Sequence, residues 1–127
     1  MSEAPLALIV EDSPTQAKQI AANLASHNIR TVIAYDGPEG LRAVDEYQPD
    51  LVVLDVNLPT MDGFQVCRRL KRDPNTRHIP VVMLTAADDS EATLQGLEAG
   101  ADDYIPKDMF ASENLTSTLV ALGIVKK

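Results

Sequence analysis

The amino-acid sequence predicts an α/β fold in which five parallel strands and five helices form a three-layer, doubly wound sheet. The first observation is an alternation, because short apolar runs rich in β-branched residues are separated by segments whose apolar residues recur at helical spacing. The second is that the clearest run, at residues 51–54, is apolar at every position, which is typical of strands covered by helices on both faces. Consecutive strand–helix units of this kind connect by right-handed crossovers.

The first unit begins with the apolar run Leu6–Val10. Ser13 then has the form of a helix N-cap, Pro14 lies at the first helical position, and Gln16 is placed to complete a capping box. Apolar residues continue at helical spacing, so we expect this helix to extend to residue 27 or 28.

The other four units repeat the pattern. Their expected strands are Arg30–Tyr35, Leu51–Leu54, Ile79–Leu84 and Ala101–Ile105. Each strand is followed by a helix that is expected to turn an apolar face inward. The inward residues are Leu41, Val44 and Tyr47 in the second helix, Phe64, Cys67 and Leu70 in the third, Leu94 and Leu97 in the fourth, and Leu115, Leu119 and Leu122 in the fifth. The fourth helix is expected to begin at residues 88–91 and to be followed by Gly100 as its C′ residue, and the fifth to begin near residues 112–114.

Length and composition restrict the class of protein. The chain has 127 residues, which suits one core, so we expect residues 1–127 to form a single domain. Apolar residues make up 45% and charged residues 24%, which disfavours disorder and coiled coil. The formal net charge of −8 argues against nucleic-acid binding through clustered Lys and Arg, and it favours cations and basic protein surfaces as partners.

The expected location is the cytoplasm. The single cysteine, Cys67, cannot form an internal disulfide. No amino-terminal apolar stretch is long enough for a signal peptide or a membrane span, so no association with a membrane is expected.

The feature around which the chain is organised is the carboxylate of Asp55, which ends the run at residues 51–54. A lone carboxylate is costly to bury, so Asp55 should lie at the solvent-facing edge of the sheet or beside positive charge. Ligands of open α/β sheets bind at this edge, outside the carboxyl ends of the strands. The alternative is that Asp55 is an ordinary loop cap.

Polar residues also follow the other strands: Glu11 and Asp12 the first, Thr85 the fourth and Lys107 the fifth. Because the carboxyl ends of parallel strands share one edge, we expect these side chains to meet Asp55. Converging carboxylates repel one another, and Mg²⁺, which prefers oxygen ligands, would remove that repulsion. The two histidines, His27 and His78, stand alone in the sequence, so a zinc site is not expected.

Such a set of groups is suited to phosphoryl transfer. A carboxylate nucleophile can accept a phosphoryl group as an acyl phosphate, and the protein then mainly positions groups and neutralises charge on the phosphoryl oxygens. Mg²⁺, the Thr85 hydroxyl and the Lys107 ammonium can do this. Taken singly, Thr85 is compatible with a strand-end cap and Lys107 with a solvated side chain, so the interpretation rests on their joint placement.

Several motifs together resemble the receiver domains of two-component response regulators, over nearly the whole chain. They are Glu11-Asp12 after the first strand, Asp55 at the end of the third, Leu58-Pro59-x-x-Asp62-Gly63, Thr85-Ala86, and Asp102-Asp103-Tyr104-Ile105-x-Lys107. The resemblance implies a flavodoxin-like (βα)5 sheet with strand order 2-1-3-4-5. It also implies a phosphoprotein of a phosphorelay, which takes a phosphoryl group from the phosphohistidine of a histidine kinase in a Mg²⁺-dependent reaction.

The same resemblance assigns roles to individual positions. It implies that Asp55 is the phosphoacceptor, that Thr85 and Tyr104 are the switch residues, and that Lys107 contacts the phosphoryl group. The Mg²⁺ ligands that it implies are Glu11, Asp12, Asp55 and the backbone carbonyl of Asn57.

The resemblance further implies a signalling domain rather than an enzyme, with intrinsic autophosphorylation and autodephosphorylation chemistry. Phosphorylation would switch the surface formed by the fourth helix, the fifth strand and the fifth helix. The expected partners are a histidine kinase or phosphotransfer protein, an effector domain or protein at that surface, and a second copy of the chain on phosphorylation.

The sequence departs from the family pattern at one place. The family usually has Pro directly after the lysine, whereas here Pro106 precedes Lys107 and Asp108 follows it. A cis peptide after the lysine cannot then be assumed, because cis bonds are essentially confined to X-Pro. Pro106 instead favours an extended conformation at Ile105, so Lys107 is expected to reach the site by a slightly different path.

Two other classes share some of these features. A Mg²⁺-dependent phosphohydrolase with an aspartyl nucleophile usually needs a second Asp two residues after the first and a cap over its substrate, but position 57 is Asn and no insertion is long enough for a cap. A flavin-binding electron carrier would need a phosphate-binding loop after the first strand and aromatic residues around the ring. Glu11-Asp12 would repel that phosphate, and aromatic residues are only 4% of the chain.

Overall fold

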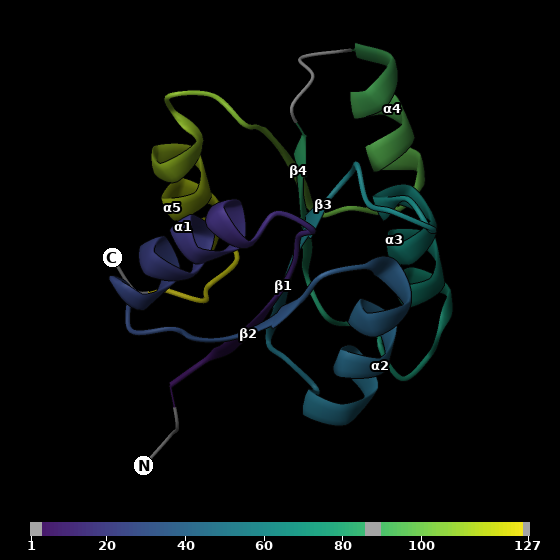
Figure 1. Cartoon of the computed structure of the whole chain (residues 1–127), viewed down its shortest axis with the longest axis horizontal. Helices are drawn as coiled ribbons and strands as arrows, with labels where there is room; N and C mark the ends of the chain where they lie inside the picture. Colours follow the sequence, from purple (N-terminus) through teal and green to yellow (C-terminus); the bar gives the residue numbers. More distant parts are fainter. Residues whose placement is uncertain (1–3, 86–89, 126–127) are drawn as a thin grey trace.

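The computed structural model describes residues 4–85 and 90–125, and the predicted fold class is confirmed. One parallel sheet has the strand order β2-β1-β3-β4-β5 (Figure 1). Its strands are β1 (Leu6–Val10), β2 (Arg30–Ala34), β3 (Leu51–Asp55), β4 (Val81–Thr85) and β5 (Asp103–Pro106). The helices are α1 (Pro14–Ala25), α2 (Gly37–Tyr47), α3 (Gly63–Arg72), α4 (Ser90–Glu98) and α5 (Ala111–Ala121).

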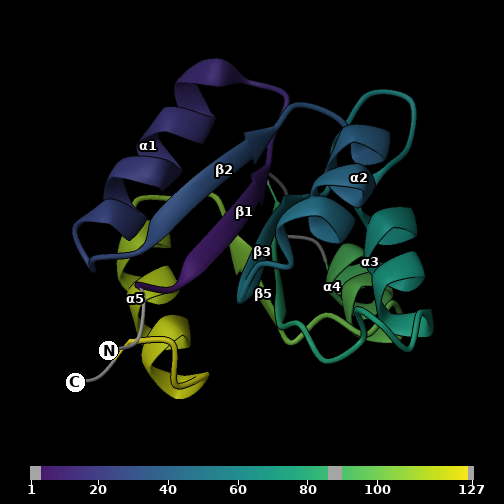
Figure 2. The ribbon, with the colours of Figure 1, turned by 90° about the horizontal axis from the view of Figure 1, so that it is seen from below.

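The sheet is the middle of three layers. Helices α1 and α5 cover one face, and α2, α3 and α4 cover the other (Figure 2). Because side chains alternate along a strand, Val52 and Leu54 belong to the core under α2 and α3, whereas Leu51 and Val53 belong to the core under α1 and α5. Both faces of β3 are therefore buried, which is why its run is apolar at every position. None of the helices in residues 4–85 and 90–125 is long and apolar enough to cross a membrane.

The register of the strands brings their carboxyl ends to one edge. Asp55 is paired with Leu84 of β4, and Thr85 is paired with Pro106 of β5. Glu11 directly follows the last residue of β1, which is paired with both β2 and β3. Consequently the polar residues that end these strands share the edge predicted from the sequence.

Side-chain caps fix where helices begin beside this edge, as α1 and α3 show. Asp62 caps α3 with a complete capping box, because its carboxylate accepts from the Gln65 N–H at 2.9 Å and the Gln65 side chain accepts from the Asp62 N–H at 3.1 Å. Ser13 caps α1 as predicted, with its hydroxyl oxygen 3.3 Å from the Gln16 nitrogen. The rest of the predicted capping box at α1 is wrong, since the Gln16 side chain bonds elsewhere.

The inward face predicted for α4 is also wrong. Leu94 and Leu97 are 55% and 59% exposed, and the helix instead buries Gly96 and Ala99. These small residues allow a close approach to the sheet, because a Cβ added at Gly96 would lie 2.7 Å from Cδ2 of Tyr104. The expected helix start at residues 88–89 lies outside the described residues.

The end of α4 follows the prediction. Gly100 has a φ of 93°, in the left-handed region that favours glycine. Its N–H donates to the Leu97 carbonyl at 3.0 Å, and the Ala101 N–H donates to the Gly96 carbonyl at 3.1 Å, which together form a Schellman motif.

Other boundaries differ from the prediction by a few residues. Helix α1 ends at Ala25 because the chain then turns through Asn28, whose φ is 61°. Strand β5 begins at Asp103, two residues later than predicted. Tyr47 was predicted to face inward, but it is exposed at the last position of α2, which packs through smaller side chains.

Substitution of Gly63 should test how tightly α3 is seated against β3. A Cβ at Gly63 would overlap the backbone oxygen of Asp55 and lie 2.9 Å from Cα of Val56, so backbone would have to move. We expect Gly63→Ala to lower the free energy of unfolding by about 3 kcal/mol, the upper end of overpacking costs. Urea unfolding measures this loss.

Gly40→Ala is the matched control. The atoms nearest to its Cβ would belong to the side chain of Val10, with a methyl group at 2.9 Å, so a side chain rather than backbone would have to shift, and the alanine offsets this with roughly 1 kcal/mol of helix propensity within α2. The net effect of Gly40→Ala on the free energy of unfolding should therefore be small. Equal losses of unfolding free energy in the two variants would contradict the inference that Gly63 packs directly against the backbone at the end of β3.

Candidate functional site

Three of the predicted site residues are buried at the carboxyl edge of the sheet. Glu11 is 1% exposed, Asp55 5% and Thr85 1%. Asp12 is exposed beside them. Buried carboxylates require compensating charge or hydrogen bonds, so the neighbours of Glu11 and Asp55 determine whether this arrangement is stable.

The predicted convergence of carboxylates is confirmed. One carboxylate oxygen from each of Glu11, Asp12 and Asp55 lies within 4.8 Å of the others. No second group of three potential metal-binding side chains of this kind occurs within the described ranges. The donors are all oxygens and one of them is open to solvent, which fits a hard cation that keeps several of its waters.

The ammonium group of Lys107 supplies positive charge to this cluster. Its Nζ lies 2.6 Å from Oε1 of Glu11 and 3.1 Å from Oδ1 of Asp55. Burial alone would lower the pKa of Lys107, but the hydrogen bond to Glu11 and the charge of Asp55 outweigh burial and raise that pKa. Lys107 is therefore protonated at neutral pH and holds the two buried carboxylates.

The backbone explains how Lys107 arrives there although Pro106 precedes it. Pro106 is the last residue of β5 and is paired with Thr85. The Lys107 N–H then donates to the Thr85 carbonyl at 2.6 Å, which extends the pairing by one residue. Asp108, at the usual position of Pro, opens the turn into α5, because its carboxylate accepts from the Phe110 N–H at 2.8 Å.

The contact between Gln16 and Lys107 was not predicted from the sequence. Its Oε1 accepts from Lys107 Nζ at 2.7 Å. The Ser13 N–H, which a capping box would offer to Gln16, instead donates to Oε2 of Glu11 at 3.1 Å. The signal in the sequence was the acidic pair directly before the helix, since Glu11 competes for that N–H.

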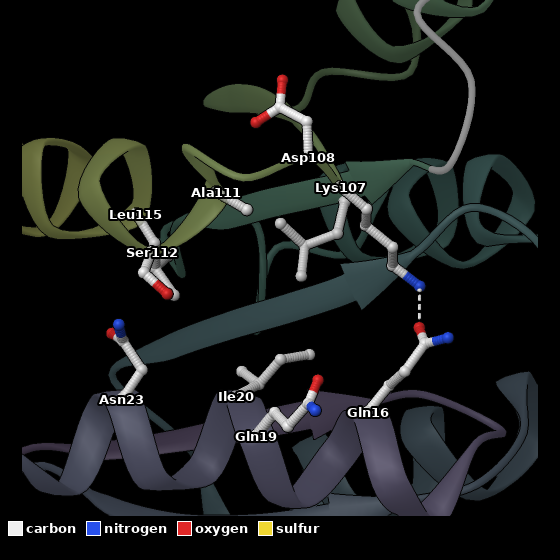
Figure 3. Close-up of a pocket in the computed structure, with 10 residues that line it drawn as sticks. Gln16, Gln19, Ile20, Asn23, Lys107, Asp108, Ala111, Ser112 and Leu115 are labelled. Atoms are coloured by element: carbon white, nitrogen blue, oxygen red, sulfur yellow. Dashed lines mark hydrogen bonds between the residues drawn. The ribbon is translucent and has the colours of Figure 1, made fainter.

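Gln16 and Lys107 also lie at one end of a cavity of about 440 Å³ between α1 and α5 (Figure 3). Its lining includes the apolar residues Ile20, Leu84 and Leu115. The buried Oδ1 of Asn23, which also lines it, has no hydrogen-bond partner among the described residues.

The two predicted switch residues lie on neighbouring strands. Thr85 ends β4 with a buried side chain. Tyr104 of β5 packs its ring against Gly96 of α4, and its buried hydroxyl has no hydrogen-bond partner within the described part of the chain. Asn57 is exposed, and its N–H lies 3.4 Å from Oδ1 of Asp55.

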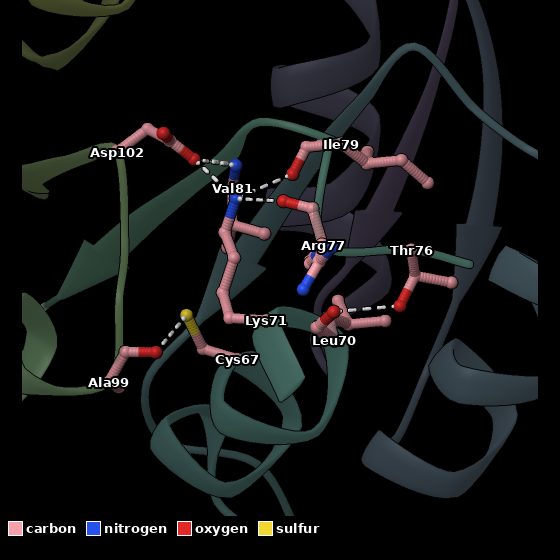
Figure 4. Close-up of polar contacts among 9 residues, drawn as sticks. All are labelled: Cys67, Leu70, Lys71, Thr76, Arg77, Ile79, Val81, Ala99 and Asp102. Atoms are coloured by element: carbon pink, nitrogen blue, oxygen red, sulfur yellow. Dashed lines mark hydrogen bonds and ion pairs between the residues drawn. The ribbon is translucent and has the colours of Figure 1, made fainter. Parts of the chain in front are cut away.

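A second lysine organises the opposite, amino end of β4 (Figure 4). Lys71 Nζ donates to the carbonyls of Arg77 and Ile79 at 3.3 and 2.8 Å, and to Oδ2 of Asp102 at 2.8 Å. That carboxylate oxygen also accepts from the Val81 N–H at 2.8 Å. Nearby, Cys67 Sγ donates to the Ala99 carbonyl at 3.4 Å, and burial raises the pKa of this thiol to about 11. These contacts tie α3, β4 and the α4–β5 turn together.

Comparisons with known proteins agree on one family. A family profile described as "Response regulator receiver domain" matches residues 7–120. The response regulator PleD of Caulobacter vibrioides is 45% identical over 100 residues, which cover 79% of this chain but only 22% of PleD. The chain thus spans less than a quarter of the length of that relative.

Two solved structures extend the similarity to the fold. The signal receiver domain of a signal transduction histidine kinase from Syntrophus aciditrophicus is 39% identical with a TM-score of 0.87, over 98% of this chain and 95% of that chain. The receiver domain of a sensor histidine kinase from Pseudomonas aeruginosa, solved with a magnesium ion coordinated in the active site cleft, is 30% identical with a TM-score of 0.85. That match covers 94% of this chain and 98% of the other.

Removing Lys107 should make the stability of the protein depend on a divalent cation. In Lys107→Ala the buried carboxylates of Glu11 and Asp55 lose their counterion, which should cost about 3 kcal/mol in the absence of divalent ions. Excess Mg²⁺ should restore more stability to this variant than to the wild type. Urea unfolding in EDTA and in Mg²⁺ measures both effects.

Lys71→Ala is the control, because it removes a lysine of similar exposure from the other end of the sheet. It should also lower stability, but Mg²⁺ should not restore it. An equal response of both variants to Mg²⁺ would contradict the assignment of the cation site to the Glu11–Asp12–Asp55 cluster.

Proposed function

The chain belongs to the response regulator receiver domain family, and we propose that Asp55 is the residue of this receiver domain that accepts a phosphoryl group. The observation that supports this most is the setting of its carboxylate. Asp55 ends β3 at the sheet edge, lies 3.1 Å from the Lys107 ammonium, and has two further carboxylates beside it. The alternative that Asp55 is a loop cap would leave this clustering without a reason.

In the proposed reaction, a carboxylate oxygen of Asp55 attacks the phosphorus of a phosphohistidine on a histidine kinase or phosphotransfer protein. An oxygen–phosphorus bond forms, the phosphorus–nitrogen bond breaks, and the imidazole leaves with the electron pair. Lys107 neutralises charge on the phosphoryl oxygens, and the Thr85 hydroxyl donates to one of them. Hydrolysis of the acyl phosphate later releases inorganic phosphate and returns the Asp55 carboxylate, so the group that accepts the phosphoryl group is part of the domain itself.

The cation in this proposal is Mg²⁺. The carboxylates of Glu11, Asp12 and Asp55 and the backbone carbonyl of Asn57 would hold it. When bound, it supplies positive charge opposite the incoming phosphoryl oxygens. Oxygen-only donors, with Asp12 open to solvent, support Mg²⁺ over a softer metal.

Neither alternative class gains support. A phosphohydrolase needs a cap over its substrate, and the connections at this edge within the described residues are short. A flavin carrier needs a site for a phosphate group after β1, where Glu11 and Asp12 stand instead.

We propose that phosphorylation changes the surface formed by α4, β5 and α5, and that partners of the domain bind there. A phosphoryl group adds acceptor oxygens beside Thr85, whose hydroxyl would move toward them and leave room for the Tyr104 ring. Leu94 and Leu97, exposed on α4, support this surface as a docking site for an effector domain, an effector protein or a second phosphorylated copy. We further propose that the domain meets these partners in the cytoplasm.

Asp55→Asn should abolish phosphorylation, because an amide cannot form the acyl phosphate. Acetyl phosphate with Mg²⁺ should add one phosphoryl group to the wild type and none to the variant. Intact-mass measurement distinguishes the two.

Asp50→Asn is the control, since Asp50 precedes β3 at the opposite end of the strand and accepts from the Leu6 N–H at 2.9 Å. It should be phosphorylated like the wild type. Incorporation into Asp55→Asn at the wild-type level would exclude Asp55 as the acceptor.

Thr85→Ala should separate acceptance of the phosphoryl group from the response of the surface. Asp55 retains its carboxylate, so phosphorylation should continue, but the Tyr104 ring should no longer respond. Chemical-shift mapping with beryllofluoride, a mimic of the phosphoryl group, tests this. Equal perturbation around Tyr104 in the variant and in the wild type would refute the proposed relay.

A further inference from the structure

The side chain of Gln16 makes a contact with the ammonium of Lys107 that neither the fold nor the capping pattern requires. Its Oε1 lies 2.7 Å from Lys107 Nζ, compared with 2.6 Å between that nitrogen and Oε1 of Glu11. An ammonium group only donates hydrogen bonds, so the amide must present its oxygen to Lys107. Figure 3 shows the two side chains meeting at the end of the cavity between α1 and α5.

We propose that Gln16 is a positioning residue, which holds the Lys107 ammonium in the orientation that receives the phosphoryl group. This inference rests on the function proposed for Asp55 and Lys107. It adds that the orientation of the lysine is set from α1, by a neutral side chain outside the acidic cluster.

Counting donors supports this role. A lysine ammonium has three N–H groups, and Lys107 has three oxygen partners, on Glu11, Asp55 and Gln16. Glu11 and Asp55 both draw the ammonium into the cluster, whereas Gln16 occupies the remaining donor from the side of α1. With all three donors occupied, the long side chain loses rotamer freedom before the phosphoryl group arrives, which is preorganisation.

The backbone of Gln16 is held by the N-cap of α1. Its N–H donates to the Ser13 hydroxyl oxygen, and the Ser13 N–H donates to Oε2 of Glu11. Since Lys107 donates to the other oxygen of Glu11, these contacts close a ring through Glu11, Ser13, Gln16 and Lys107. The start of α1 is therefore linked to the position of the lysine.

The neutrality of Gln16 is part of the argument. A carboxylate at this position would also accept from Lys107, but it would compete with the phosphoryl group for the ammonium. It would at the same time suit the first turn of α1, where acidic side chains interact favourably with the helix dipole. Stability and phosphoryl affinity should therefore change in different directions in Gln16→Glu, which a purely structural role does not predict.

The test is titration with beryllofluoride in saturating Mg²⁺, with thermal unfolding of each variant as the check on folding. Gln16→Met keeps an unbranched side chain of good helix propensity and removes the acceptor, and it should weaken beryllofluoride binding about three- to tenfold, the range of one hydrogen bond. Gln16→Glu should weaken binding more than Gln16→Met while unfolding at the wild-type temperature or above. In a Lys107→Ala background, Gln16→Met should have no further effect.

Gln19→Met is the control, because Gln19 lies on the same helix and lines the same cavity, and it is not among the hydrogen-bond partners of Lys107 in the described residues. It should bind beryllofluoride like the wild type. Wild-type affinity in both Gln16 variants, or the same loss with and without Lys107, would overturn the role of Gln16 alone. A wild-type chain that binds no beryllofluoride would overturn the proposed function, and the positioning role with it.

Discussion

The ion pairs of Lys107 with Glu11 and Asp55 are the interaction on which the functional edge depends. Two carboxylates are almost fully buried there, and buried charges are stable only when they are paired or hydrogen-bonded. Lys107 provides that pairing with contacts of 2.6 and 3.1 Å. The fold thereby maintains a concentration of negative charge at one point, and in the proposed function the same lysine would neutralise a phosphoryl group.

Two lysines at opposite ends of the sheet illustrate how similar chemistry serves different purposes. Lys71 bonds two backbone carbonyls and Asp102, so its partners are fixed parts of the fold. Among the described residues, the partners of the Lys107 ammonium are side chains, two of which belong to the acidic cluster. A network of side chains can exchange partners when charge is added, whereas one anchored to backbone carbonyls holds its elements in place. The asymmetry is consistent with a rigid amino edge and a responsive carboxyl edge.

Much of the fold was predictable because burial leaves a strong pattern. The uniformly apolar run of β3 predicts a strand that is covered on both faces, and Asp55 at its end predicts the edge where the site lies. The strand order was implied by the family resemblance and is confirmed. Leu94 and Leu97 are exposed although their spacing predicts an inward face, because helical spacing indicates which residues share a face but not whether that face packs on the core or is exposed to solvent. Gln16 was assigned to a capping box because local spacing cannot reveal that Glu11 takes the Ser13 N–H, and the contact with Lys107 joins residues 91 positions apart.

We propose that an acyl phosphate forms at this edge of the sheet on one particular carboxylate, that of Asp55. The most direct measurement is to phosphorylate the wild-type chain with acetyl phosphate and Mg²⁺, reduce the acyl phosphate with borohydride, and locate the resulting homoserine by peptide mass spectrometry. We expect conversion at position 55 and at no other carboxylate. Homoserine at position 12, or at position 11 the 2-amino-5-hydroxypentanoic acid that a reduced acyl phosphate of Glu11 would give, with Asp55 intact, would contradict it.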